Sequence, residues 1–236
     1  LAKDKINITF PIVDIHSTYY YDLLKQALLE SGYQADITKK EIPSLRAKLS
    51  LEHNDIDIHF MVESKDRDAK FMPIKVGLTN GLIAHRLLLV PRNESKLYEK
   101  VNSLSDFRTL KKTAGMGKAW FDVKVWHANQ LPVYKIGGDY TLLFKMLANK
   151  KRGFNYYSTG FNEAWEEYHK YGHLGLEIEP RLMLIYDRDY IFYLGSEAAS
   201  LYKNKGIWYV SVSFDNQRMA RSLKTRNKVI AYKFKD

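Results

Sequence analysis

The N-terminal part of the chain alternates between strand-like and helix-like segments, and this alternation restricts the fold more than any other feature. Residues 5–11 (KINITFP) alternate in polarity and stop at a proline, as a strand does. Tyr20, Leu24 and Leu28 then recur at helical spacing, and Gly32 follows as a C-terminal cap. Three further segments are predicted in the order strand, helix, strand: residues 34–38, 43–51 and 56–61. The βαβαβ order predicts an α/β fold.

The remainder of the chain continues the alternation. Predicted strands occupy residues 82–91, 133–136, 154–157, 182–186 and 190–194, and predicted helices occupy 106–111, 121–129, a segment from 139 or 140 to 147, and 161–171. The tail after Ser196 is predicted to be mostly helical with a strand-like end. No linker rich in Gly, Pro or Ser separates the halves, so we expect two lobes joined by crossing strands near residues 87–90 and 186–190.

Lobe 1 is predicted to comprise residues 1–87 and 188–236, and lobe 2 residues 88–187. Ligands of open α/β sheets lie beyond the carboxyl ends of the strands, so we expect a ligand cleft between the lobes.

Composition restricts the compartment and the partners. No run of apolar residues reaches the length of a membrane span. Residue 1 is Leu and the chain has no Cys, which fits an exported periplasmic protein whose signal peptide has been removed. The formal net charge of +10 favours acidic partners, but the basic residues are scattered, so no nucleic-acid partner is expected. We expect a monomer.

Arg67 is a candidate anion-binding residue because it follows the predicted strand at residues 56–61. A guanidinium grips a carboxylate or phosphate with two hydrogen bonds and is always charged. The alternative is a solvated Arg in the charged run at residues 65–68.

A glycine-containing turn, Gly115-Met-Gly117, precedes a predicted helix, where backbone N–H groups converge on anions. The turn lacks the third Gly of a dinucleotide fingerprint and the Gly-Lys-Ser/Thr ending of a P-loop, so no nucleotide cofactor is predicted. Trp120 either stacks on a ligand or packs against the turn.

Catalytic and metal chemistry find little support in the sequence. There is no G-x-S-x-G elbow and no Ser-x-x-Lys motif, so no catalytic residue is assigned and the chain is predicted not to be an enzyme. His169 and His173 have metal-ligand spacing, but Gly172 interrupts their helix, and no metal or other cofactor is expected.

The chain resembles the type II periplasmic solute-binding proteins, in particular family 3, whose members capture polar amino acids for ABC importers. It is similar to an uncharacterised transporter substrate-binding-domain branch of that family. The resemblance implies two lobes, each a mixed β-sheet flanked by helices. The residues that carry it, besides Arg67, are Gly115, Gly117, Trp120, Asp122, Ala128, Asn129, Leu131, Pro132, Val133, residues 143–147, Glu179 and Pro180.

The resemblance implies a carboxylate site. In the amino-acid binders, an Arg shortly after the third strand clamps the ligand carboxylate, and Arg67 occupies that place. Backbone N–H groups of a second-lobe turn hold the same carboxylate, and here that turn contains Gly117, Lys118 and Trp120.

The resemblance also implies an acidic residue and an aromatic lid in the loop after the first strand, roles that Asp14 and Tyr19 or Tyr20 match. The amine-binding Asp of the family is missing, because the chain reads YYSTGFNEA where it is expected. Glu163 is the nearest carboxylate, so an α-amino acid is not the necessary ligand.

The expected function is an extracytoplasmic solute-binding protein that closes around a small polar ligand, anionic or zwitterionic, for an ABC-type importer. Its partners are then the solute and an inner-membrane permease or a sensor kinase. Two alternatives stay open: a sensory input or scaffold domain with the same fold, and a cell-wall lytic enzyme built on it.

Overall fold

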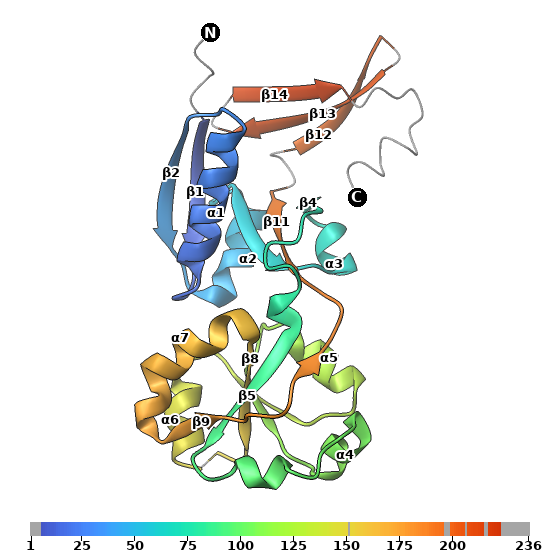
Figure 1. Ribbon diagram of the computed structural model, residues 1–236. Helices are drawn as coiled ribbons and strands as arrows, with labels where there is room; N and C mark the ends of the chain where they lie inside the picture. Colours follow the sequence, from blue (N-terminus) through green and yellow to red (C-terminus); the bar gives the residue numbers. More distant parts are fainter. Residues whose placement is uncertain (1–5, 151, 196–198, 206, 215–216, 223–236) are drawn as a thin grey trace. The chain divides into compact units, whose positions relative to one another are not determined.

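The computed structural model describes residues 6–150, 152–195, 199–205, 207–214 and 217–222 (Figure 1). The chain divides into two compact units. Unit 1 takes in residues 1–78 and 190–236, and unit 2 residues 79–189. The chain therefore passes between the units twice, at Leu78–Thr79 and at Asp189–Tyr190.

Unit 1 begins with the predicted βαβαβ order, which is confirmed. Its first elements are β1 (Ile6–Ile12), α1 (Ser17–Glu30), β2 (Ala35–Glu41), α2 (Ser44–Glu52) and β3 (Ile58–Val62). Strands β1 and β2 run parallel, from the pair Ile6 and Ala35 to the pair Ile12 and Glu41. The Tyr20 ring of α1 stacks on Phe60 of β3 at 4.1 Å between centroids, so α1 covers the apolar face of these strands.

Unit 1 is completed by a strand from much later in the chain. After β3 come α3 (Lys65–Asp68) and β4 (Met72–Ile74), and β11 (Tyr190–Leu194) lies antiparallel between β3 and β4. Asp57 connects this sheet to β1, because Thr9 donates its N–H to the Asp57 carboxylate at 2.7 Å and accepts the Asp57 N–H at 3.1 Å.

Residues 199–204, 207–214 and 217–222 of unit 1 form a three-stranded antiparallel sheet, so the prediction of a mostly helical tail is wrong for these residues. The strands are β12 (Ala199–Asn204), β13 (Ile207–Phe214) and β14 (Gln217–Ser222). The β13 sequence IWYVSVSF alternates in polarity and is rich in aromatic and β-branched residues, which favour a pleated strand over a helix. The predicted cap, Ser196, lies outside the described residues.

Unit 2 is built around a six-stranded mixed sheet with the order β10-β5-β8-β6-β7, in which β9 also pairs with β5. Strands β6, β7 and β8 are parallel, whereas β5 is antiparallel to β8. Its elements are the 3-10 turn η1 (Leu82–Ala84), β5 (His85–Pro91), η2 (Ser95–Tyr98), α4 (Leu104–Thr109), β6 (Ala114–Gly117), α5 (Asp122–Ala128), β7 (Val133–Ile136), α6 (Leu142–Ala148), β8 (Tyr156–Gly160), α7 (Phe161–Tyr171), η3 (Gly172–Leu174), β9 (Leu176–Ile178) and β10 (Leu184–Ile185).

Helices cover both faces of the sheet in unit 2 (Figure 1). Phe107 of α4 and Trp126 of α5 pack with Leu88 and Val90 on one face, and Phe144 of α6 packs with Leu89 on the other. Neighbouring residues of β5 thus point to opposite faces, as the pleat of a strand requires. Within the described residues, no helix combines the length and the apolar character needed to cross a membrane.

Candidate functional site

The candidate site residues divide between the units. Asp14, Tyr19, Tyr20 and Arg67 belong to unit 1, and Gly117, Lys118, Trp120 and Glu163 belong to unit 2.

Asp14 orders the loop between β1 and α1. Its Oδ1 accepts hydrogen bonds from the His16 N–H and the Ser17 hydroxyl, both at 3.0 Å. The Ser17 Oγ in turn accepts the Val13 N–H at 3.0 Å. Such local side-chain bonds to the backbone fix a loop conformation, so Asp14 shapes the loop at the end of β1.

The two adjacent tyrosines of α1 have different environments. Tyr20 is 1% exposed and belongs to the core of unit 1, whereas Tyr19 is 52% exposed. The Tyr19 hydroxyl donates to the carbonyl of Leu78, the last residue before the chain leaves unit 1, at 2.9 Å. Tyr19 is therefore the ring of this pair that α1 exposes to solvent.

Arg67 lies in the short helix α3, directly after β3. Ser64 caps this helix, because its Oγ accepts the Arg67 N–H, and the Arg67 guanidinium donates to the carbonyl of Val62. The side chain is half-buried. Burial, and secondarily the Arg67 charge, lowers the pKa of His59 to about 3 and also lowers the pKa of Lys48. The Arg67 charge thus disfavours a further positive charge on these two side chains.

The acidic groups beside Arg67 have partners of their own. Asp68 accepts the Tyr193 hydroxyl at 2.7 Å and pairs with Lys75 at 2.5 Å, and Lys75 also pairs with Glu63 at 2.7 Å. Burial acts against the charge of Lys75, but its bonds to Asp68 and Glu63 raise the Lys75 pKa. These contacts offset the two carboxylates next to Arg67.

In unit 2, the turn after β6 is shaped by a contact between Gly117 and Trp120. A Cβ atom at residue 117 would lie 2.6 Å from the Trp120 Nε1, so only glycine fits under the indole ring. The Lys118 N–H donates to the Ile136 carbonyl at 2.7 Å, and the Trp120 N–H donates to the Gly117 carbonyl at 3.0 Å. Two of the N–H groups expected to meet an anion are therefore engaged within unit 2.

Lys118 and Ala119 form the exposed tip of this turn. Trp120 is half-buried, with its ring centroid 5.5 Å from that of Tyr140 and 5.8 Å from that of Tyr157. The indole thus packs against unit 2 and still presents part of its surface to solvent.

Glu163 lies in the first turn of α7 and is half-buried. The pKa of Tyr186 is raised, first by burial, then by Asp122, with a smaller contribution from Glu163. Burial also raises the pKa of Tyr157, to which Glu167 and, more weakly, Glu163 contribute. The Glu163 carboxylate therefore acts electrostatically on both tyrosines, more weakly than Asp122 and Glu167 do.

A buried polar group that sequence reasoning missed lies on the α4 and α5 face of the sheet. The Arg86 Nε stands 3.1 Å from the Asp122 Oδ1, which also accepts the Tyr186 hydroxyl at 3.0 Å. The Arg86 Nη2 donates to the Ser158 carbonyl at 2.7 Å. We call Arg86, Asp122, Ser158 and Tyr186 the Arg86 cluster. The only signal in the sequence was a charged residue inside an otherwise apolar strand.

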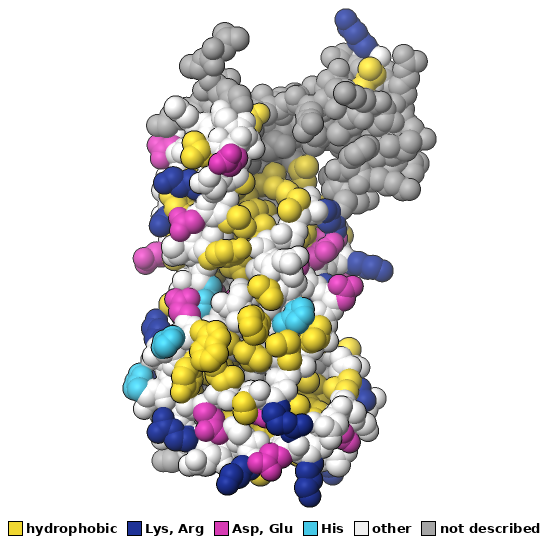
Figure 2. Space-filling view, viewed as in Figure 1, with side chains coloured by type: hydrophobic (Ala, Val, Ile, Leu, Met, Phe, Trp, Pro, Cys, Tyr) yellow, Lys and Arg dark blue, Asp and Glu magenta, His cyan; other side chains and the backbone are white. Residues whose placement is uncertain are grey.

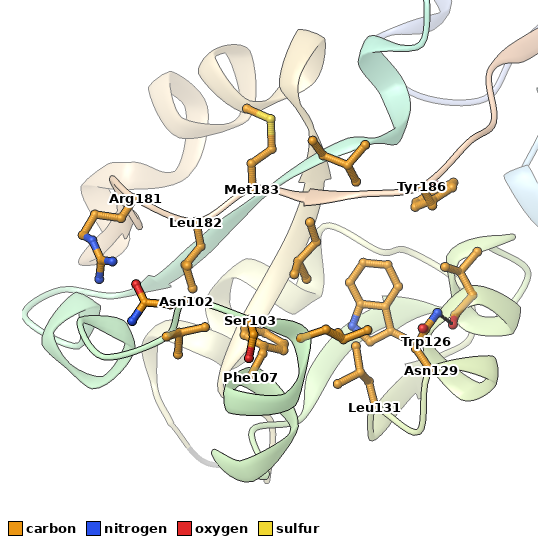
Figure 3. A pocket seen from close by; sticks show the side chains of 15 residues that line it. Asn102, Ser103, Phe107, Trp126, Asn129, Leu131, Arg181, Leu182, Met183 and Tyr186 are labelled. Atoms are coloured by element: carbon orange, nitrogen blue, oxygen red, sulfur yellow. Dashed lines mark hydrogen bonds between the residues drawn. The ribbon is translucent and has the colours of Figure 1, made fainter.

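A groove of about 490 Å³ lies on the same face of unit 2 (Figure 3). Phe107, Trp126 and Leu131 form its floor, and Arg181 and Tyr186 stand at opposite ends. The Arg181 guanidinium donates to the carbonyls of Tyr98 and Glu99, so its charge is partly satisfied by unit 2 itself.

Apolar side chains are exposed beside β10 and on α7, where Figure 2 shows a hydrophobic patch on unit 2. They include Met183, Ile185, Phe161 and Trp165. In the part of the chain that the structure describes, no three His, Asp or Glu side chains gather as a metal site requires.

No protein-family model and no curated protein matches this sequence. Solved structures do match it. An ancestral arginine-binding protein bound to arginine has a TM-score of 0.57 at 14% identity, with 83% of this chain and 86% of that chain covered. The probable amino-acid ABC transporter extracellular-binding protein of Bacillus subtilis has a TM-score of 0.56 at 17% identity, over 82% and 87% of the two chains.

This chain has the periplasmic-binding-protein fold. The predicted fold class is thereby confirmed, and the identities, all far below 25%, carry the likeness no further than the fold. A histidine kinase sensor domain with similarity to periplasmic binding proteins has the same fold, with a TM-score of 0.56 at 12% identity over 83% and 84% of the two chains. The periplasmic-binding-protein fold is thus found both in ABC binding components and in a sensor domain.

Proposed function

We propose that this protein is an extracytoplasmic solute-binding protein. It captures a small polar ligand, anionic or zwitterionic, by closure of its two units and delivers it to an ABC-type importer. The observation that carries the proposal is the fold. An arginine-binding protein and a probable amino-acid ABC transporter binding protein are among the solved structures that share it. Closure is driven by the better contacts that a ligand makes in the closed state.

The charges of both units support an anionic group in the ligand. Arg67 follows β3 in unit 1, next to carboxylates that Lys75 offsets, and Lys118 is exposed on the turn after β6 in unit 2. A guanidinium and an ammonium group suit a carboxylate. In the proposed complex, these two residues and the N–H of Ala119 hold the ligand carboxylate.

The remaining candidate residues fit the rest of a small solute. Tyr19 and Trp120 present aromatic surface, and Glu163 supplies a carboxylate for a cationic group. Asp14 acts by shaping the loop that leads into α1, the helix of Tyr19, since its Oδ1 accepts hydrogen bonds from His16 and Ser17. Every role in this proposal is one of binding, and none requires a catalytic group.

Isothermal titration tests the proposal. The purified chain is titrated with L-arginine, L-lysine, L-glutamine, L-cystine and a set of dicarboxylates. We expect binding of at least one compound, and we expect Arg67→Ala to weaken it about tenfold or more, because a charge-assisted hydrogen bond is lost. Arg46→Ala is the matched control, since Arg46 is an exposed Arg of α2 in the same unit.

Two outcomes contradict parts of the proposal. Equal affinity of wild type and Arg67→Ala for a bound compound removes Arg67 from the site. Absence of binding across the whole set, together with no small molecule detected by native mass spectrometry of the purified protein, removes the function itself.

A sensory input domain is the second candidate, because a histidine kinase sensor domain shares the fold. The two candidates differ in the protein that recognises the ligand-bound form. Crosslinking of the ligand-loaded chain in its native membranes, followed by mass spectrometry, identifies a permease in the first case and a kinase in the second.

A further inference from the structure

Asp122 stands two residues after Trp120, at the first position of α5, and joins this helix to two other parts of unit 2. Its Oδ1 lies 3.1 Å from the Arg86 Nε of β5 and accepts the Tyr186 hydroxyl at 3.0 Å. The Asp122 Oδ1 thus links α5, which follows the candidate ligand turn, to the central strand β5 and to the segment that leads out of unit 2.

The Arg86 guanidinium extends these contacts to two more elements. Its Nη1 donates to the Ile83 carbonyl of η1 at 3.0 Å, and its Nη2 donates to the Ser158 carbonyl of β8 at 2.7 Å. The side chains of Arg86 and Asp122 are 4% and 8% exposed. Water competes little for these bonds, and a buried ion pair that further hydrogen bonds support keeps its geometry because breaking it strands a charge.

Both segments through which the chain crosses between units are tied together inside unit 2. The Asp189 carboxylate accepts the Thr79 N–H at 3.2 Å and the Gly81 N–H at 2.9 Å. The Tyr186 N–H donates to the Ala84 carbonyl at 3.3 Å. Through Tyr186, these crossing segments are connected to Asp122 and hence to the turn at residues 117–122.

We propose that the Arg86 cluster makes the turn at residues 117–122 and the two crossing segments, residues 79–86 and 184–189, move as one body. Asp122 and Tyr186 are then positioning residues: a ligand that contacts the turn displaces the crossing segments with it. The coupling within unit 2 rests on the ion pair and the hydrogen bonds described above, whereas its part in ligand-driven closure rests on the proposed function.

Hydrogen exchange of the ligand-free protein tests the coupling. Tyr186→Phe keeps the ring and removes the hydroxyl that bonds to Asp122. We expect exchange about tenfold faster at the amides of Trp120 in the turn and Val123 in the first turn of α5, and by a similar factor at Ala84 and Arg188 in the crossing segments. The Ala114 amide, which bonds to the Pro132 carbonyl at 3.0 Å in the sheet, is expected to keep its exchange rate.

Tyr134→Phe is the matched control. It removes a phenolic hydroxyl from the same unit, and the described structure shows no hydrogen bond of that hydroxyl. A purely local effect of the lost hydroxyl would change one segment alone. Faster exchange at only the turn or only the crossing segments, or no change at either, overturns the proposal.

A second measurement uses the ligand found by titration. Because the sequence has no Cys, Lys25→Cys in α1 and Lys145→Cys in α6 place one dye on each unit without interference. We expect the ligand-induced change in energy transfer to fall at least twofold in Tyr186→Phe and to persist in Tyr134→Phe. An equal change in both variants contradicts the coupling. A wild type that binds nothing contradicts the proposed function instead, and the exchange experiment then decides the coupling.

Discussion

Gly117 shows how a single residue determines the shape of the candidate ligand turn. The Trp120 indole lies where a Cβ of residue 117 would be, and the same ring contacts Tyr140 and Tyr157. The indole therefore has little room to withdraw. The glycine in this motif is required by the packing of the tryptophan and not by an unusual backbone angle.

Gly117→Ala is expected to destabilise the protein by about 1–3 kcal/mol, because the added methyl group overpacks the turn. Urea unfolding measures the change. Gly137→Ala is the control, since a Cβ at residue 137 meets no atom within 4 Å and that substitution should change stability by less than about 0.5 kcal/mol. Equal effects of the two substitutions would show that Trp120 does not close over Gly117.

His59 predicts a pH dependence. Burial, with a smaller contribution from the Arg67 charge, lowers its pKa to about 3 in the folded protein, whereas an unfolded histidine titrates near 6.5. Between these values the unfolded chain binds the extra proton, so stability is full above about pH 6.5 and falls as the pH decreases toward 3. The slope reaches about 1.4 kcal/mol per pH unit.

Urea unfolding at pH 7.5 and pH 5 checks this expectation. Wild type should lose about 2 kcal/mol more than His59→Leu between the two values, because the variant lacks the group that takes up the proton. His127→Leu, which replaces an exposed histidine, should behave like wild type. If His59→Leu keeps the full pH dependence, other groups cause it.

At the scale of elements, helix α4 depends on its first residues. Ser103 caps it by accepting the Asp106 N–H at 3.1 Å, and the Asp106 carboxylate accepts the Asn102 N–H at 3.0 Å. Hydrogen bonds from the Asn102 backbone and the Ser103 side chain lower the pKa of Asp106. Ser103→Ala should cost about 1 kcal/mol in urea unfolding, whereas Ser105→Ala, inside the helix, should cost less than about 0.3 kcal/mol. A similar cost for both would rule out capping.

The elements with strong periodicity were predictable from the sequence. The β1 to β3 region alternates clearly, and the α6 helix presents Leu143 and Leu147 to the same core. The short helix α3 and strand β4 were not predicted. Helix α3 has four polar residues and strand β4 has three residues, and segments this short show no hydrophobic periodicity. The tail strands were not predicted, although the aromatic and β-branched residues of IWYVSVSF favour a strand.

The residues of the candidate site were less predictable than the fold. Arg67 follows β3 in the sequence, so its place at the strand end could be read from local order. The Arg86 cluster joins four residues that are far apart in the chain, and no local pattern reveals such a contact. Likewise, only the structure shows that the Lys118 and Trp120 N–H groups bond within unit 2.

At the scale of the whole molecule, each unit has its own core. Aromatic rings of α1 and β3 lie in one core of unit 1. In unit 2, the sheet packs between two layers of helices. Two independent cores joined by two crossings are what relative motion of lobes requires. The proposed ligand capture therefore requires a backbone change only at the two crossings, and the cores of both units stay intact.

The position of β11 also has a consequence for biosynthesis. This strand supplies the middle of the three-stranded sheet of unit 1, yet it is translated after all of unit 2. As the nascent chain leaves the ribosome, residues 79–189 contain every strand of the six-stranded sheet of unit 2, whereas the sheet β3-β11-β4 still lacks its middle strand. Strands β3 and β4 therefore stay unjoined until β11, which lies between them, has been synthesised.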